Sequence, residues 1–269
     1  MKSSMNVLVT GCSVSSGYNY NDPDDPRIWH QRLFQNFPGS KVTNLAVTGA
    51  NNHYIFLETL HALTNQHYDV VVVQFTQPIR FNLQIGLELW NTMSTLQDAP
   101  ISLHNQIEVP GPWLNNIRKQ LLPLLNPHQE ILNIIKYINA LVELQQNIRR
   151  GKIIFVYSGG FDGEWAWPLG FFDKKTITRP SDLSTAEQQL LEVDSRSDED
   201  VVALYNMIHS QYARYGGIHE KNWINLYESF DDIAIDRVSD TDPHPGDASQ
   251  IHFAELFLPR VKDMLQLEK

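Results

Sequence analysis

The chain of 269 residues contains little cysteine and no long apolar run. Its single cysteine, Cys12, excludes an intramolecular disulfide and any metal site that needs several thiolates. No apolar stretch approaches the roughly 18 consecutive residues that a membrane-spanning helix needs, and the apolar run at 7–9 is too short for a signal peptide. We therefore expect a soluble, cytoplasmic protein with no membrane partner.

Basic residues are also scarce. Lysine and arginine number 21 against 31 acidic residues, which gives a formal net charge of -10, and they form no block. A surface that follows nucleic-acid phosphates needs clustered cations, so we expect no nucleic-acid partner. The histidines include no HxxxH or HExxH pair, and the acidic residues at 21–26 lack the spacing of an EF-hand. The sequence therefore predicts no metal site.

Short apolar runs alternate with segments of helical spacing along the chain. The apolar runs are 7–9, 42–47, 70–75, 153–157 and 223–226, and the helical segments include 28–34, 55–63 and 131–144. Runs of this length that are apolar throughout suit buried parallel strands, and the alternation is typical of a doubly wound sheet. We expect an α/β fold in a single domain over 1–269, with a mainly parallel five-stranded sheet and helices on both faces.

Two regions interrupt this alternation, near 82–126 and 159–200. Both are long for connections inside a compact domain, and such insertions often serve as lids or binding loops. We expect them beside the active site. The alternative is that they cover the edge of the sheet or form a contact between two copies of the chain.

Residues 6–17, NVLVTGCSVSSG, form an apolar run that ends in a turn of small residues. Two classes of enzyme begin this way: one binds a dinucleotide pyrophosphate at the turn, and the other uses the serine as a nucleophile. Short-chain dehydrogenases need a glycine where Ser15 stands and a lysine four residues after a tyrosine, and no tyrosine here has one. The sequence therefore disfavours the dinucleotide, and we expect no cofactor.

The nucleophile interpretation needs a base and an acid as partners for Ser13. A serine at the end of a first strand projects from the carboxyl edge of the sheet, where backbone N–H groups can stabilise an oxyanion. His244 stands between Pro243 and Pro245, which place it in a stiff extended segment ahead of the last helix. Asp242 is spaced to accept the other ring N–H. We therefore predict a catalytic triad of Ser13, His244 and Asp242.

Three segments carry a family resemblance. GCSVSSG resembles the first block of the SGNH, or GDSL-like, hydrolases, with Cys12 where the family most often has aspartate. NLAVTGANN at 44–52 resembles the second block and DPHPG the last, in the family's order. The resemblance implies a three-layer α/β/α sandwich of the flavodoxin-like type. It also implies a serine esterase that cleaves a small O-acyl ester, such as acetyl, through an acyl-serine.

By the same resemblance, the N–H groups of Ser13 and Gly49 form the oxyanion hole, and Asn51 is a candidate substrate contact. The expected partner is a small-molecule or carbohydrate ester. Two alternatives stay open. One is an O-acyltransferase that uses the same triad with a hydroxyl acceptor, and the other is a catalytically weak SGNH-like binding or scaffold protein.

The chain departs from the family at the third block, a Gly-x-Asn-Asp whose asparagine is a further oxyanion donor. Residues 71–81 read VVVQFTQPIRF instead. The Gln77 amide or the Thr76 hydroxyl is a candidate replacement for that donor. Arg80 is a candidate for binding an anionic group of the substrate, with a surface ion pair as the alternative.

The acid and the cysteine also depart from the family pattern. The commonest position of the acid, three residues before the histidine, holds Thr241. Asp242 instead makes an Asp-x-His spacing, with Asp240 as the fallback acid. This spacing resembles that of some SGNH-like polysaccharide O-acetyltransferases and related esterases, and the resemblance tilts the expectation toward transfer. A thiolate at Cys12 is an alternative nucleophile, against the simpler interpretation of a buried packing residue.

Overall fold

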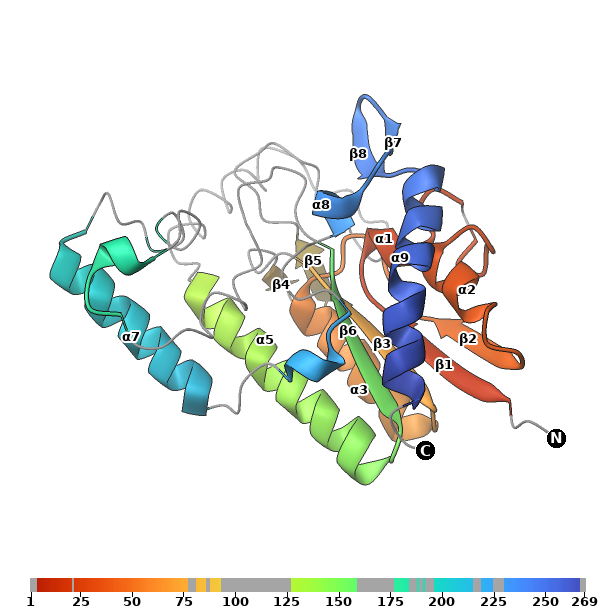
Figure 1. Cartoon of the computed structure of the whole chain (residues 1–269), viewed down its shortest axis with the longest axis horizontal. Coiled ribbons are helices and arrows are strands. Elements are labelled where there is room, and N and C mark those ends of the chain that lie inside the picture. The colour runs from red at the N-terminus through yellow and green to blue at the C-terminus, as the bar shows by residue number, and fades with distance from the viewer. Residues whose placement is uncertain are drawn as a thin grey trace.

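The computed structural model describes residues 4–20, 22–76, 81–85, 88–92, 127–158, 177–183, 188, 191, 196–214, 219–224 and 230–266 (Figure 1). The elements in chain order are β1 (Met5–Thr10), α1 (Ser13–Ser16), α2 (Trp29–Phe34), β2 (Ser40–Asn44), α3 (Asn52–Asn65), β3 (Val70–Phe75), β4 (Phe81–Ile85), β5 (Glu88–Thr92), α5 (Pro127–Val142), the π-helical turn η2 (Glu143–Ile148), β6 (Lys152–Tyr157), the 3-10 turn η4 (Pro180–Asp182), α7 (Asp198–Arg214), the 3-10 turn η6 (Glu220–Asn222), α8 (Phe230–Ile233), β7 (Arg237–Ser239), β8 (Asp242–Pro245) and α9 (Asp247–Gln266).

The central sheet is parallel and has the strand order β2-β1-β3-β6. All six residues of β3 and the last five of β6 are buried. A strand that is covered on both faces buries every side chain, which is why these segments read as continuous apolar runs rather than alternating ones. The predicted parallel α/β fold is confirmed.

The described sheet has four strands, one fewer than predicted. The expected fifth strand, 223–226, contributes a single parallel bridge between Trp223 and Phe155, and its residues 225–226 lie outside the described part. Just before it, the side-chain amide of Asn222 donates to the Ile153 carbonyl at 2.8 Å. A side chain thus takes a place on the edge of β6 that the backbone of a longer strand would fill.

Helices cover both faces of the sheet, as predicted (Figure 1). Successive side chains of a strand point to opposite faces. On one face, Leu8 of β1 packs in a core with α3 and α5. On the other face, Val7 and Val9 of the same strand pack in a second core with α2 and α9. The sheet is therefore the middle layer of three.

The described residues cover only parts of the two predicted insertions. The region 82–126 contains most of the antiparallel hairpin of β4 and β5, and its residues 93–126 lie outside the described part. In the region 159–200, η4 and the start of α7 are described, whereas 159–176 are not. The expectation that these insertions flank the active site stays a prediction. Within the described residues, no helix has the length and apolar character needed to span a membrane.

Candidate active site

Ser13 begins α1 immediately after a turn that joins the helix to β1. Gly11 makes this turn possible, because a Cβ at that position would lie 2.5 Å from Oε1 of Gln74 on the neighbouring β3. The backbone N–H groups of Ser15 and Ser16 bond to the Cys12 carbonyl at 3.1 and 3.0 Å. The N–H of Ser13 stands at the first position of α1, where no earlier helical carbonyl can accept it. Such groups are available to a negatively charged ligand.

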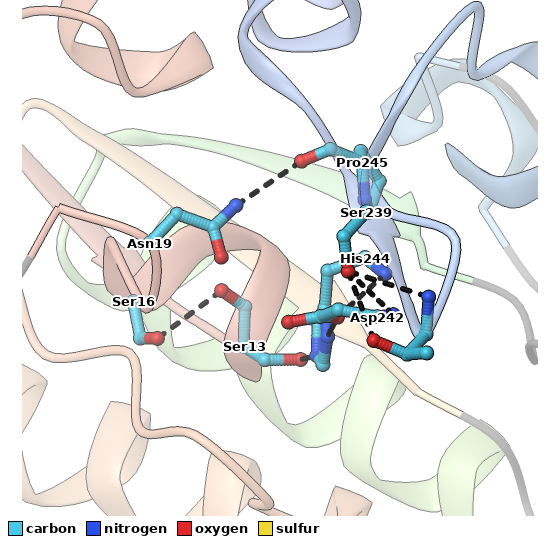
Figure 2. A network of polar contacts seen from close by, with 8 residues as sticks. Ser13, Ser16, Asn19, Ser239, Asp242, His244 and Pro245 are labelled. Carbon is cyan, nitrogen blue, oxygen red and sulfur yellow. Dashed lines mark hydrogen bonds and ion pairs between the residues drawn. The ribbon is translucent and has the colours of Figure 1, made fainter.

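His244 lies on β8, which pairs with β7 in an antiparallel ribbon just ahead of α9. The segment is extended, as the flanking prolines predict. Figure 2 shows Ser13 and His244 pointing toward one another from α1 and β8. The histidine Nε2 is 2.9 Å from Oγ of Ser13, although the two residues are 231 positions apart in the chain.

Asp242 completes a continuous chain of hydrogen bonds. Its Oδ1 lies 2.6 Å from Nδ1 of His244 and also accepts the His244 backbone N–H at 3.0 Å. Partial burial opposes the charged form of Asp242, but these two bonds outweigh it and hold the pKa of the carboxyl below its ordinary value. A charged carboxylate at Nδ1 keeps the proton on that nitrogen, which leaves the Nε2 lone pair for the Ser13 hydroxyl.

The ribbon itself holds Asp242 in place. The Ser239 hydroxyl accepts the backbone N–H groups of Asp242 and Thr241 at 3.0 and 3.3 Å, which closes the tip of the ribbon (Figure 2). Asp240, the fallback acid, is exposed at this tip. The position three residues before the histidine is thus occupied by Thr241 in the turn, whereas Asp242 stands beside the ring.

Gly49 lies in a turn that is bonded to the β1–α1 connection. The chain after β2 continues beside β1, and the Val47 N–H donates to the Gly11 carbonyl at 3.0 Å. The Ala50 N–H then closes a turn onto the Val47 carbonyl at 3.1 Å, with Gly49 at a φ of 79° that favours glycine. Oγ1 of Thr48 lies 2.9 Å from Oγ of Ser16, which ties this turn to α1.

Asn51, the predicted substrate contact, caps a helix. Its Oδ1 accepts the Tyr54 N–H at 2.9 Å and satisfies one of the first N–H groups of α3. The side chain is buried, and its contact with a substrate stays a prediction.

Thr76 follows the end of β3, and the Asn52 side chain bonds to both its backbone N–H and its backbone carbonyl. The Asn52 amide accepts the Thr76 N–H and donates to the Thr76 carbonyl, both at 2.8 Å. The Thr76 Oγ1 is buried and has no hydrogen-bond partner where the structure describes the chain. The other candidates near this edge, Gln77 and Arg80, lie outside the described residues.

Gln74 is a polar residue of the site that the motif analysis passed over. It is fully buried on β3, where its Oε1 accepts the Cys12 N–H at 3.3 Å and its Nε2 lies 3.1 Å from the Cys12 sulfur. The same sulfur lies 3.5 Å from Oγ of Ser158. The thiol is 1% exposed, which agrees with a packing role. The signal in the sequence was a lone amide inside the run VVVVQF.

No group of three His, Cys, Asp or Glu side chains within the described residues is arranged to hold a metal ion. A small cavity beside Ser13 and His244 is lined by residues of α1 and the segment after it, by Pro245 and by Gln250 of α9. The groups present there are hydroxyls, amides, an imidazole and a carboxylate. This set suits acyl transfer through a serine and proton transfer through a histidine.

Comparison with known proteins finds only distant likenesses. No protein-family model and no curated protein matches the chain. Solved structures similar to this chain include a member of the lipolytic protein G-D-S-L family from Veillonella parvula DSM 2008, with 11% identity over 99% of this chain and 100% of that chain and a TM-score of 0.42. Others are the psychrotrophic esterase EstA from Pseudoalteromonas sp. (11% identity, 97% and 98% covered, TM-score 0.46) and the acetyl xylan esterase AlAXEase (10%, 96% and 100%, TM-score 0.42). These likenesses are too distant to assign an activity, so the chemistry rests on the site itself.

Proposed function

We propose that the chain is a serine esterase of the SGNH type that hydrolyses an O-acyl ester with a small acyl group. The observation that carries this proposal is the hydrogen-bond chain from Ser13 Oγ through His244 to Asp242, with distances of 2.9 and 2.6 Å. A nucleophile, a base and an acid that orients the base are the parts that acyl transfer needs. A binding or scaffold protein has no need of this alignment.

In the first step, Ser13 Oγ attacks the ester carbonyl carbon while His244 Nε2 takes the hydroxyl proton. Asp242 accepts the Nδ1–H bond throughout and stabilises the imidazolium. The carbonyl oxygen becomes an oxyanion, and the N–H groups of Ser13 and Gly49 donate to it. The bonds from the Gly49 turn to Gly11 and Ser16 support this assignment, because they hold the turn against α1.

In the second step, the tetrahedral intermediate collapses and the bond from carbon to the alcohol oxygen breaks. His244 gives its proton to the leaving alcohol, which leaves an acyl group on Ser13. Water then attacks the acyl carbon while His244 takes its proton, and a second collapse returns that proton to Ser13 Oγ. The products are the free acid and the alcohol, and the resting site is restored.

The third oxyanion donor is proposed to come from the segment just after β3. Loss of one such donor typically raises the barrier by about 3 kcal/mol, so a replacement for the family's asparagine is needed. Thr76 is supported by its unpartnered hydroxyl, within the described residues, and by the two Asn52 bonds that tie it to the segment after Gly49. Gln77, one residue further along, is the alternative.

The substrate is proposed to be a small-molecule or carbohydrate ester, and Arg80 is a candidate contact for an anionic group on it. Transfer to a hydroxyl acceptor instead of water is the second candidate function. The Asp-x-His spacing, in which Asp242 stands at Nδ1 of the histidine, resembles that of some SGNH-like polysaccharide O-acetyltransferases and so supports this candidate. The two functions share the acyl-serine and differ only in what attacks it.

The test is turnover of p-nitrophenyl acetate together with mass-spectrometric mapping of a fluorophosphonate probe. We expect the probe on Ser13 and a loss of both signals in Ser13→Ala. Cys12→Ala is the matched control, since it removes the neighbouring thiol and leaves the hydroxyl, and it should keep the label on Ser13. Full turnover in Ser13→Ala would refute the proposal. Slow hydrolysis that accelerates with added sugars or alcohols, with the acyl group recovered on them, would identify transfer.

A further inference from the structure

Three consecutive side chains after α1 reach the segment that carries His244. Each of residues 18–20 contacts a different residue of 244–247. Asn19 donates its amide to the Pro245 carbonyl at 3.3 Å (Figure 2). The contacts on either side of it are the Tyr18 ring on the His244 ring and the Tyr20 hydroxyl donating to Oδ1 of Asp247 at 2.8 Å. Residues 18–20 therefore hold the segment that carries His244, the proposed base.

The stacked pair is the contact nearest to the chemistry. The ring centroids of Tyr18 and His244 lie 4.8 Å apart, and the ring planes meet at 27°. The tyrosine ring thus covers one face of the imidazole whose Nε2 faces Ser13. An aromatic face attracts a cation, so this ring stabilises the imidazolium more than the neutral imidazole. It also opposes rotation of the imidazole out of that plane.

Core packing does not account for Tyr18. Its side chain remains 46% exposed and belongs to neither core cluster, whereas Tyr20 packs against the second one. The path of the segment is set by Gly17, which has a φ of 75° and where a Cβ would lie 2.6 Å from Cδ1 of Ile28. The Tyr18 ring is thus half exposed, follows a turn that requires glycine, and stacks on the His244 ring. This placement points to a role at His244.

We propose that Tyr18 is a positioning residue that holds the His244 imidazole with Nε2 toward Ser13 and stabilises the imidazolium formed during acyl transfer. The inference rests on the proposed esterase function, because Tyr18 acts through His244. It adds a residue that none of the three sequence blocks predicts to have this role.

The charged and titratable groups around His244 determine how the inference can be tested. Asp242 faces Nδ1, and its lowered pKa keeps it charged near neutral pH. Further along the same segment, Tyr20 bonds to Asp247, and the Arg27 guanidinium lies 4.4 Å from the centroid of the Tyr20 ring. Burial is the main cause that raises the pKa of Tyr20, so this phenol stays neutral. Of these groups, His244 is the one whose proton the proposed mechanism moves.

The experiment compares Tyr18→Phe and Tyr18→Leu in the pH dependence of kcat and KM for p-nitrophenyl acetate. Tyr18→Leu removes the aromatic face, and we expect kcat to fall about threefold to tenfold with KM nearly unchanged. The acid limb should move to lower pH by about half a unit, because the imidazolium loses a stabilising contact. Tyr18→Phe keeps the face and should stay within about twofold of the native protein in both respects.

Tyr20→Phe is the matched control. It removes another contact of residues 18–20, the bond to Asp247, and leaves the stacked pair of Tyr18 and His244 in place. Its acid limb should not move. The inference is overturned if Tyr18→Leu leaves the acid limb unmoved, or if Tyr18→Phe is as impaired as Tyr18→Leu. A rise in KM at unchanged kcat would overturn it too, because Tyr18 would then bind substrate.

The failure of the inference and the failure of the proposed function have different signatures. Retained turnover in Ser13→Ala refutes the function. The stack is measured independently by following the His244 imidazole resonances by NMR against pH, which needs no turnover. A titration midpoint about half a unit lower in Tyr18→Leu than in the native chain supports the stack, and equal midpoints refute it.

Discussion

At the scale of single residues, the proposed site depends on Asp242 more than on any other carboxylate near it. One oxygen of this side chain bonds to both the backbone N–H and the ring Nδ1 of His244. It therefore determines the rotamer of the ring and the nitrogen that carries the proton. An amide at this position keeps the shape but can present a donor to Nδ1, which favours the wrong tautomer.

We predict that Asp242→Asn lowers kcat by roughly 10³- to 10⁴-fold with little change in melting temperature. Asp240→Asn, at the exposed tip of the same ribbon, should stay close to the native rate. The measurement is kcat for p-nitrophenyl acetate beside a thermal unfolding curve. If Asp240→Asn proved the more damaging variant, the assignment of the acid would have to be exchanged.

His30 is a second residue whose protonation matters, although it lies outside the proposed chemistry. It is fully buried on α2, and its Nε2 lies 2.9 Å from the Ser15 carbonyl at α1. Burial lowers the pKa of His30 to about 4, against an ordinary value near 6.5. The folded protein then binds fewer protons here than the unfolded chain between these two pH values. Its contribution to stability is complete above about pH 6.5 and is lost as the pH falls toward 4.

We predict that the free energy of unfolding falls between pH 6.5 and pH 4 by roughly 2 to 3 kcal/mol on account of His30. In His30→Gln that part of the pH dependence should disappear, at the expense of lower stability at pH 7. His61→Gln, an exposed histidine on α3, should leave the slope unaltered. Urea unfolding at several pH values measures this, and an unchanged slope in His30→Gln would refute the role of this histidine.

At the scale of elements, the Asp236 carboxylate is one of the groups that tie the ribbon of β7 and β8 to α9, beside the Ser249 hydroxyl. Asp236 Oδ1 accepts the Ser249 N–H at 2.6 Å and Oδ2 accepts the Ala248 N–H at 3.0 Å. Gly246 must be small here, because a Cβ would lie 2.5 Å from Oδ2 of Asp236. Partial burial opposes ionisation, but the hydrogen bonds outweigh it and lower the pKa of Asp236. The Asp236 carboxylate thus caps α9 and anchors the start of the ribbon.

We predict that Asp236→Ala destabilises the fold by about 1 to 3 kcal/mol. It should also lower kcat, because the ribbon that carries His244 loses this anchor. Asp263→Ala, on the exposed side of α9, should change neither quantity. Because its folded pKa is lowered, Asp236 stabilises fully above its unfolded value near 4, and that stability is lost as the pH falls below it. Chemical unfolding at pH 7 and pH 3 measures how much stability Asp236→Ala loses at each pH. An equal loss at the two pH values would contradict the predicted dependence on the ionisation of Asp236.

Element boundaries were predicted best where burial is complete. The run at 70–75 coincides with β3, and 153–157 differs from β6 by one residue. The run at 42–47 was displaced toward the C-terminus from β2, which ends at Asn44. There the asparagine amide bonds to the carbonyls of Ser15 and Pro23. After β2, the Leu45 N–H still bonds to the Val9 carbonyl of β1, and Leu45 and Val47 are partly buried against the first core. Their apolar character therefore reflects partial burial without regular strand geometry.

At the scale of the whole molecule, the proposed site results from the way the parallel sheet and its helices bring distant segments of the chain together. Parallel strands end at the same edge of the sheet, and Figure 1 shows α1 and β8 at that end of the molecule. The helix that follows β8, α9, packs on α2 in the second core, where the Phe257 ring meets the Trp29 ring edge-on. This packing holds the last segment of the chain against the first. Ser13 and His244, which are 231 positions apart in the chain, are therefore brought together by the packing of α9 on α2.

The sequence by itself determined what depends on neighbours in the chain: the buried strands, the Gly11 turn before Ser13, the extended segment around His244 and the spacing of its acid. Backbone conformation and periodicity are local, so a single sequence records them. The tertiary structure decided which of these meet. The 2.9 Å contact of Ser13 with His244, the burial of Cys12 against Gln74 and the stack of Tyr18 join segments whose separation in the chain is settled only when several elements pack at once.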